Sequence, residues 1–153
     1  MIRVRAASPG DPAALRLMGE LSDTLEAITG SSGRASFDPA EMAGDGAMFA
    51  VAYCGSDAVG CGAFRPLRPG VAEIKRMYAR PATQGVGAAV LSFLESQAAA
   101  MGYREAWLET RRVNARAVDF YIRHGYNQIE NFGKYAGREE AVCFAKRLTG
   151  PLV

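Results

Sequence analysis

The feature that most constrains the fold is a glycine-rich turn that joins a strand-like segment to a helix-like one. Residues 71–79 follow a Pro-Gly turn and read as a strand, and residues 86–101 place apolar side chains on one helical face. A further strand-like segment follows at 106–109. A strand, a helix and a second strand in this order form a parallel crossover. The sequence therefore predicts a sheet with at least one parallel pair and a helix packed on its face.

The other segments predict mostly antiparallel strands. A hairpin is expected around the turn at 55–57, and the first helix after Asp11, an N-cap residue followed by Pro12. The expected order is a strand (2–6), two helices (from 12 and from 39), three strands (48–53, 58–64, 71–79), a helix (86–101), a strand (106–109), a helix (114–123) and two strands (126–130, 141–148). This is an α/β fold with a mixed, mostly antiparallel central sheet of about seven strands and about four helices on its faces. We expect a single domain over residues 1–153.

Composition argues against several classes of function. A formal net charge of +2 and scattered basic residues do not suit a nucleic-acid surface. Cys54, Cys61 and Cys143 lie in expected strands and read as core residues, and one histidine makes a zinc site unexpected. No apolar run is long enough to span a bilayer, and the N-terminal residues lack the apolar region of a signal peptide. We therefore expect a cytoplasmic protein without a membrane, nucleic-acid or metal partner.

The turn at 81–89 has the features of a phosphate-binding site. N–H groups in the first turn of a helix lack intrahelical partners, and the helix dipole favours an anion there by roughly 0.3–1 kcal/mol. Gly85 and Gly87 let a phosphate approach the backbone, and Gln84 can add a side-chain donor. The turn lacks the Gly-Lys-Ser/Thr ending of a nucleotide triphosphate loop, and Val90 stands where a dinucleotide fingerprint has its third glycine. A plain glycine-rich turn is the alternative.

The segment Gln84-Gly85-Val86-Gly87-Ala88-Ala89 resembles the coenzyme A motif Gln/Arg-x-x-Gly-x-Gly/Ala of the GNAT superfamily of N-acetyltransferases. The strand before it is similar to that family's fourth strand, and the order of elements is similar over the whole chain. The resemblance implies acetyl-CoA as the donor substrate. Its pyrophosphate would be held by backbone N–H groups of the turn, and its acetyl and pantetheine arm would pass the strand backbone. The cofactor-binding residues implied are Met77, Tyr78, Ala79, Gln84, Gly85, Val86, Gly87, Ala88 and Ala89.

A second pattern, Asn-x-x-Ala-x-x-x-Tyr followed by Gly-Tyr, resembles another hallmark of the same family. It is carried by Asn114, Ala117, Tyr121 and Gly125. Asn114 suits a helix N-cap, and the resemblance implies that Asn114, Ala117 and Tyr121 also border the cofactor arm. Tyr121 lies four residues beyond Ala117 and so on the same helix face. Its phenol can donate a hydrogen bond or proton to the thiolate that leaves when an amine attacks a thioester. A core aromatic is the alternative role.

The attacking amine must lose a proton, because a lysine-like amine has a pKa of about 10.4. Glu73 is the first candidate for the general base, because the resemblance places its strand beside the thioester. Glu109 in the next strand is the second candidate, and transfer through water is a further alternative. Strict alternation places Glu73 on the strand face of Met77, unless a bulge shifts the register. His124 is expected at a helix C-terminus, where the dipole stabilises an imidazolium, so we expect a structural role.

The resemblance implies that residues 26–38 and 130–140 build the acceptor pocket. Phe132 and Tyr135 can line it, and Arg34 and Lys134 can meet an acceptor carboxylate. The absence of an acidic cluster in the sequence favours a small acceptor over a polycation. The sequence thus predicts an N-acetyltransferase that moves the acetyl group of acetyl-CoA to a primary amine of a small molecule or amino acid in a ternary complex. A homodimer is expected from the resemblance. A non-catalytic acyl-CoA sensor and an acetyltransferase acting on a protein amine are the alternatives.

Overall fold

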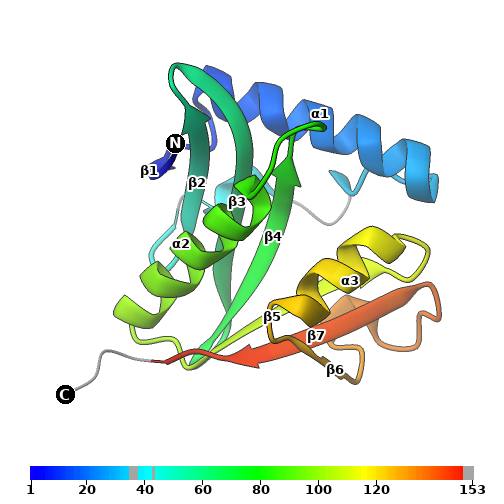
Figure 1. The fold of residues 1–153 in the computed structure, drawn as a ribbon. Coiled ribbons are helices and arrows are strands. Elements are labelled where there is room, and N and C mark those ends of the chain that lie inside the picture. The colour runs from blue at the N-terminus through cyan, green and yellow to red at the C-terminus, as the bar shows by residue number, and fades with distance from the viewer. Residues whose placement is uncertain (35–37, 43, 150–153) are drawn as a thin grey trace.

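The chain forms one seven-stranded sheet with helices on both faces (Figure 1). The computed structural model describes residues 1–34, 38–42 and 44–149. The sheet order is β1-β2-β3-β4-β5-β7-β6, and every neighbouring pair is antiparallel except β4 and β5. The strands are β1 (Ile2–Ala7), β2 (Met48–Cys54), β3 (Asp57–Arg68), β4 (Val71–Ala79), β5 (Glu105–Arg111), β6 (Asn127–Ile129) and β7 (Ala141–Arg147).

Three α-helices cover the sheet in the described part of the chain. They are α1 (Pro12–Thr29), α2 (Val86–Ala100) and α3 (Ala115–Arg123), and two 3₁₀ helices are η2 (Pro39–Met42) and η3 (Gly133–Tyr135). The mixed seven-stranded sheet confirms the predicted fold class. The short second helix predicted from Pro39 is the single 3₁₀ turn η2. Within the described ranges, no helix combines the length and the apolar character needed to cross a membrane.

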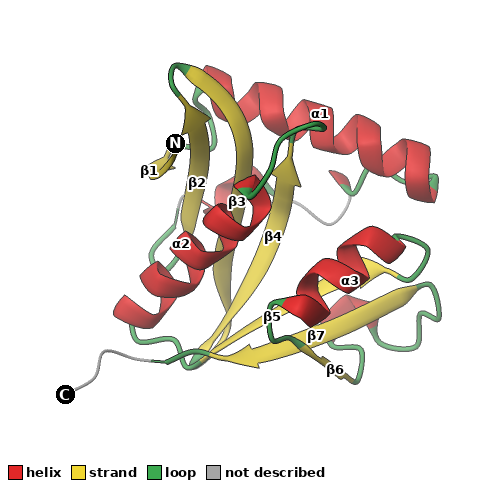
Figure 2. Cartoon of the chain, in the orientation of Figure 1, coloured by secondary structure: helices red, strands yellow, loops and turns green. Residues whose placement is uncertain are grey.

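The helices α1 and α2 lie on opposite faces of the sheet (Figure 2). Successive residues of β2 alternate between them: Phe49 and Val51 pack with α1, and Ala50 and Ala52 pack with α2. The third helix, α3, joins the cluster on the α2 face through Tyr121. Each face of the sheet therefore has its own apolar core.

The packed face of α1 agrees in part with the stripe that helical spacing predicts from the sequence, namely Leu15, Met18, Leu21, Leu25 and Ile28. Met18 and Leu21 are buried as expected, whereas Leu15 and Ile28 are 57% and 43% exposed. The helix packs through a set at i, i+3, i+4 and i+7, namely Ala14, Leu17, Met18 and Leu21. The apolar residues of this helix are numerous enough to define two adjacent stripes, and only contact with β2 and β3 selects one of them.

The helix α2 packs directly on β3 because two glycines there carry no side chain. A Cβ atom added to Gly62 would lie 2.5 Å from the sulfur of Met77, 2.8 Å from Val90 and 2.9 Å from Leu94. A Cβ atom added to Gly60 would likewise collide with the side chain of Val86, the first residue of α2. The glycines thus bring the N-terminus of α2 down to the end of β4.

The strands β4 and β5 pair over a short stretch only. Their register covers Val71–Glu73 of β4 against residues 105–107 of β5, and no further pairing of the two strands occurs in the described chain. Beyond Glu73 the two strands diverge, and the separation is visible between the labels β4 and β5 (Figure 2). The gap is flanked by α2 and α3 on one face and by α1 on the other.

A β-bulge in β4 changes which side chains face each helix. Between the pairs Cys61–Tyr78 and Ala63–Lys75, β4 contains one residue more than β3. Arg76 occupies this position with a φ of 57°, in the left-handed region. Arg76 faces α1, whereas Met77 packs in the α2 cluster. Because Ile74 also belongs to the α2 cluster, Glu73 points to the α1 face, opposite to Met77.

We predict that Gly62→Ala lowers the free energy of unfolding by about 1–3 kcal/mol, the usual cost of overpacking. The added methyl group collides with the side chains of Met77, Val90 and Leu94. Urea denaturation measures the change. The matched control is Gly19→Ala in α1, where no atom lies within 4 Å of the added Cβ. This control should raise stability by about 0.5–1 kcal/mol. Wild-type stability in Gly62→Ala would contradict the close packing of α2.

Candidate active site

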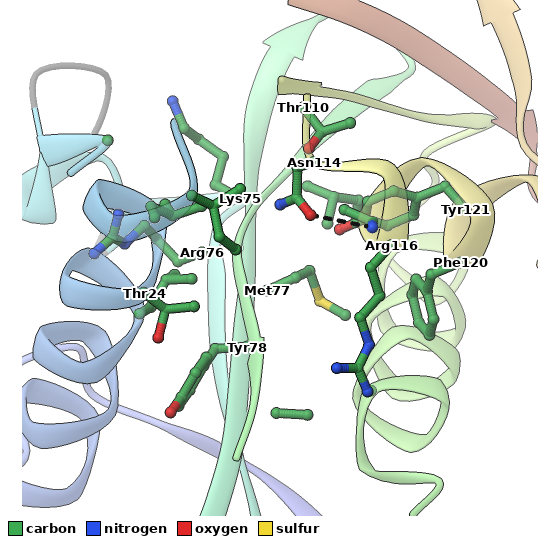
Figure 3. A pocket seen from close by; sticks show the side chains of 18 of the residues that line it. Thr24, Lys75, Arg76, Met77, Tyr78, Thr110, Asn114, Arg116, Phe120 and Tyr121 are labelled. Atoms are coloured by element: carbon green, nitrogen blue, oxygen red, sulfur yellow. Dashed lines mark hydrogen bonds between the residues drawn. The ribbon is translucent and has the colours of Figure 1, made fainter. Parts of the chain in front are cut away.

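A cavity of about 570 Å³ opens where β4 and β5 diverge. Its walls come from the C-terminal half of α1, from β4, from the first turn of α2, from the end of β5 and from α3. Figure 3 shows side chains on both sides of β4: Thr24, Arg76 and Tyr78 toward α1, and Met77, Asn114, Arg116, Phe120 and Tyr121 on the side of α2 and α3. The cavity therefore connects the two faces of the sheet through the gap.

The first turn of α2 presents backbone donors to the cavity. The first intrahelical bond runs from the N–H of Ala89 to the carbonyl oxygen of Gly85 at 3.0 Å. The N–H groups of residues 86–88 therefore precede the helical ladder, and these residues line the cavity. Gly85 has a φ of 76°, which glycine adopts without strain. This turn contributes no carboxylate to the described lining of the cavity, so no negative charge there would repel an anion. Its N–H donors therefore suit a phosphate group.

The structure does not bring every residue of the predicted motif to the cavity. Gln84 is exposed and Ala89 lies further along α2, and neither lines the cavity. The residues of the motif that do line the cavity are Gly85, Val86, Gly87 and Ala88, at the start of α2.

The other cofactor-binding residues implied by the sequence do line the cavity: Met77, Tyr78, Ala79, Asn114, Ala117 and Tyr121. The predicted N-cap is confirmed, because the side-chain oxygen of Asn114 accepts a hydrogen bond from the N–H of Ala117 at 3.3 Å. Tyr78 differs from the rest. Its hydroxyl donates to Glu20 of α1 at 3.1 Å, so its side chain serves the contact between α1 and β4.

Tyr121 is the one buried residue of α3, with 8% of its surface exposed. Its ring makes edge contacts with Phe120 and Tyr126, with centroids 5.2 and 5.7 Å away. Burial raises the pKa of Tyr121 above its usual value of 10.0. The phenol therefore keeps its proton at neutral pH and can act as a donor toward the cavity.

Glu73 is buried and ion-paired. Its Oε1 lies 3.1 Å from Nε of Arg65, the residue opposite it on β3, and its Oε2 lies 4.0 Å from Nζ of Lys75. Arg65 also pairs with Glu41 at 2.6 Å. The charge of Glu73 is therefore part of a network that joins β3, β4 and η2, although its side chain lines the cavity.

Glu109 lies in a different environment, on β5 across the gap. Its side chain is 12% exposed, and Nε of Arg111 lies 3.6 Å from its Oε2. That oxygen is buried and accepts no hydrogen bond from the described residues. Burial raises the pKa of Glu109, an effect that the charges of Arg111 and Lys75 oppose. A desolvated carboxylate with a raised pKa at a cavity wall suits proton transfer.

The cysteines behave as core residues. Cys61 and Cys143 are fully buried, and burial raises the pKa of the Cys61 thiol to about 12. Cys54 is half-buried at the end of β2. The described lining of the cavity contains no cysteine, so the thiols have no access to a ligand there.

Sequence reasoning misses part of the wall formed by α3. Arg116, Phe120 and Arg123 line the cavity, and their spacing of i, i+4 and i+7 is the only sequence signal for this face. His124 ends α3 as expected, with Nδ1 2.7 Å from the carbonyl oxygen of Phe120, and it also lines the cavity. Of the four acceptor-side residues proposed from the sequence, only Tyr135 lines the cavity, and Phe132, Arg34 and Lys134 do not.

Comparison with known proteins identifies the class. The sequence model of the acetyltransferase (GNAT) family matches residues 16–126. The chain belongs to this family. It is 28% identical over 137 residues to an IAA acetyltransferase of Azospirillum brasilense, covering 88% of this chain and 90% of the relative.

Solved structures show the same fold. A protein from Klebsiella pneumoniae assigned to the acyl-CoA N-acyltransferases superposes with a TM-score of 0.82 at 25% identity, covering 97% of this chain and 99% of that one. The PaiA N-acetyltransferase of Thermoplasma acidophilum, solved in complex with coenzyme A, has a TM-score of 0.73 at 17% identity and coverage of 96% and 99%.

We predict that Glu109→Gln raises the free energy of unfolding at neutral pH. Since burial raises the pKa of Glu109, folding favours its protonated form. The contribution of Glu109 to the free energy of unfolding is therefore present in full below pH 4.5, the ordinary pKa of a glutamate side chain. It is lost as the pH rises through the raised pKa of Glu109. The gain from the substitution should therefore shrink toward pH 4.5. Urea denaturation of wild type and variant at both pH values measures this. The exposed Glu130→Gln serves as control, and a gain of equal size there would contradict the assignment.

Proposed function

We propose that the protein is an N-acetyltransferase that moves the acetyl group of acetyl-CoA to a primary amine of a small molecule or amino acid. The transfer is direct and takes place in a ternary complex. The observation that carries the proposal is the continuity of the cavity. It runs from the N–H groups at the start of α2, through the gap between β4 and β5, to the buried carboxylate of Glu109 and the phenol of Tyr121.

The donor fits the α2 side of the cavity. The N–H groups of residues 86–88 would hold its pyrophosphate, with the positive end of the helix dipole behind them. Met77 and Ala79 of β4, and Asn114 and Ala117 of α3, border the gap that leads away from this turn. When bound, acetyl-CoA supplies an acetyl thioester that an amine can attack. Membership of the acetyltransferase family and the solved coenzyme A complex of a protein with this fold support coenzyme A as the ligand.

Glu109 is the better placed of the two carboxylates to take the proton of the amine. Glu73 is engaged by Arg65 at 3.1 Å, and neutralising Glu73 would remove a charge that faces both Arg65 and the buried Lys75. Glu109 has an oxygen without a hydrogen-bond donor among the described residues and a raised pKa. This reverses the order of preference expected from the sequence, where the strand of Glu73 made it the first candidate.

Tyr121 acts on the leaving group. As the nitrogen–carbon bond forms and the carbon–sulfur bond breaks, the electron pair of that bond passes to sulfur. The phenol of Tyr121 can donate its proton or a hydrogen bond to this thiolate. Its burial excludes water and keeps the phenol neutral, so the donor is available when the sulfur becomes negative.

The acceptor would enter from the α1 face, where Leu25, Ile28 and Tyr135 line the cavity beside Glu109. A cavity of about 570 Å³ shared with the cofactor arm favours a small acceptor. The name of the Azospirillum brasilense relative, an IAA acetyltransferase, supports a small-molecule acceptor as well. A protein amine and a non-catalytic acyl-CoA sensor are the alternatives that the experiments below separate.

The proposal predicts that acetyl-CoA and free coenzyme A raise the melting temperature, whereas ATP does not. A ligand that binds only the folded state stabilises it by about 2.7 kcal/mol at a hundredfold excess over its Kd. Thermal unfolding with each of the three ligands measures this, and thiol release with a panel of amines follows. Absence of a shift with millimolar coenzyme A would refute the function. A shift without turnover of any small or peptide amine would favour the sensor.

Glu109→Gln and Tyr121→Phe should each lower kcat by about a hundredfold or more, the usual contribution of a positioned acid or base. Both variants should bind coenzyme A like the wild type, because neither group carries the phosphate site. Glu73→Gln should affect kcat less and stability more, since it breaks the network with Arg65. Tyr53→Phe, remote from the cavity on β2, is the matched control for the tyrosine. A larger loss of kcat in Glu73→Gln than in Glu109→Gln would assign the role of general base to Glu73 instead of Glu109.

A further inference from the structure

Arg111 ends β5 on the same face of the sheet as Glu109. Residues two apart in a strand point to one side, so the two side chains are neighbours, and both line the cavity. Nε of Arg111 lies 3.6 Å from Oε2 of Glu109, and its Nη1 lies 3.7 Å from Oε2 of Glu140. Both distances exceed that of a hydrogen bond. Within the described chain, the Arg111 guanidinium therefore has ionic neighbours but no hydrogen bond, although its side chain is only 32% exposed.

Two other arginines of the cavity wall are engaged by the protein itself. Arg80 forms a two-pronged pair with Glu20 at 2.8 and 3.0 Å, and Arg76 donates to the hydroxyl of Ser22 at 2.6 Å. These contacts hold β4 to α1. A guanidinium group has five N–H donors in a planar fork. Those of Arg111 lie at the cavity wall and can bind a group that enters the cavity.

The neighbouring carboxylate of Glu109 also has an oxygen without a hydrogen bond. Its Oε2 is buried and accepts none from the described residues. An acceptor with negative charge and a donor with positive charge thus lie side by side at one wall of the cavity. A ligand that satisfies both needs an ammonium and a carboxylate close together. An α-amino acid carries these two groups on one carbon atom, and so it complements the pair.

The wall that α1 contributes is apolar. Leu21, Leu25 and Ile28 follow each other at i, i+4 and i+7 and line the cavity. Leu21 is buried, whereas Ile28 is 43% exposed, so the end of this stripe leaves the core and presents apolar surface to the cavity. A ligand side chain that packs there removes apolar surface from water. This wall therefore favours a ligand with an apolar side chain.

We propose that Arg111 is a specificity residue that binds the carboxylate of the acceptor, and that the acceptor is an α-amino acid with an apolar side chain. The guanidinium holds the carboxylate by paired, charge-assisted hydrogen bonds, and the amine lies toward Oε2 of Glu109. The apolar side chain packs on Leu25 and Ile28. The inference rests on the proposed function and narrows its acceptors to amines that carry a carboxylate on the same carbon atom.

The test compares acceptors that differ in the carboxylate. L-leucine and L-phenylalanine are paired with 3-methylbutylamine and 2-phenylethylamine, and thiol release from acetyl-CoA gives kcat and KM for each. The proteins are the wild type, Arg111→Gln, Arg111→Lys and the control Arg112→Gln. The control removes the charge of the next residue, which is exposed and does not belong to the described lining of the cavity. The shift in melting temperature with coenzyme A shows that each variant folds and binds the donor.

The wild type and the control should prefer each amino acid to its amine by about tenfold or more in kcat/KM, mainly through KM. Arg111→Gln should lose this preference. Arg111→Lys should keep part of it, because lysine retains the charge but not the planar fork. Burial raises the pKa of Glu109 and the charge of Arg111 opposes this effect, so Arg111→Gln raises that pKa further. This change affects both series of acceptors alike and cancels in the ratio.

Three outcomes would count against the inference while leaving the proposed function intact. They are amine turnover by the wild type without a preference for the amino acids, a preference that Arg111→Gln retains, and turnover of neither series by a protein that binds coenzyme A. Equal kcat/KM for L-serine and L-leucine would overturn the apolar side chain of the acceptor. Failure of the wild type to bind coenzyme A would instead remove the proposed function itself.

Discussion

The site depends on the point at which β4 and β5 stop pairing. The two strands share three residue pairs and then separate, so beyond Glu73 their facing edges no longer bond to each other. Backbone polar groups at such inner edges need partners, and a bound molecule can supply them. The separation also lets side chains from both faces of the sheet reach one cavity. Glu109 from the α1 face and Tyr121 from the α2 face would not meet across a continuous sheet.

Contacts outside the gap determine its width. On one side, Arg76 occupies the bulge of β4 and binds α1 through Ser22 and the Met18 carbonyl oxygen. On the other side, Glu95 of α2 accepts hydrogen bonds from the hydroxyl of Tyr126 at 2.8 Å and from Lys146 of β7 at 3.0 Å. These contacts join α1 to β4 and α2 to β7, the strand next to β5. The fold itself therefore forms the cavity, and a ligand would not have to break strand pairing between β4 and β5 to enter it.

Turn and capping residues in the sequence predicted much of the architecture. Most of the features that the sequence did not predict depend on the register in which distant strands pair. The bounds of β4 and the cap at Asn114 follow from turn and capping residues, which act over a few positions. The bulge at Arg76 has no such signal, because a positive φ in a non-glycine residue is imposed by pairing with β3. The pairing of Glu73 with Arg65 arises from the same register, and it is the reason that we propose Glu109 as the base. The homodimer stays an expectation from the family resemblance.

The short junction of β4 and β5 has a mechanical consequence. The sheet has two parts, β1 to β4 and β5 to β7, which pair with each other at three positions only. A contact between Glu95 of α2 and Lys146 of β7 also joins them. A molecule bound between these two parts of the sheet would contact both of them. Its contacts would then add to the three residue pairs through which the backbone joins the two parts, so binding would increase the coupling between them.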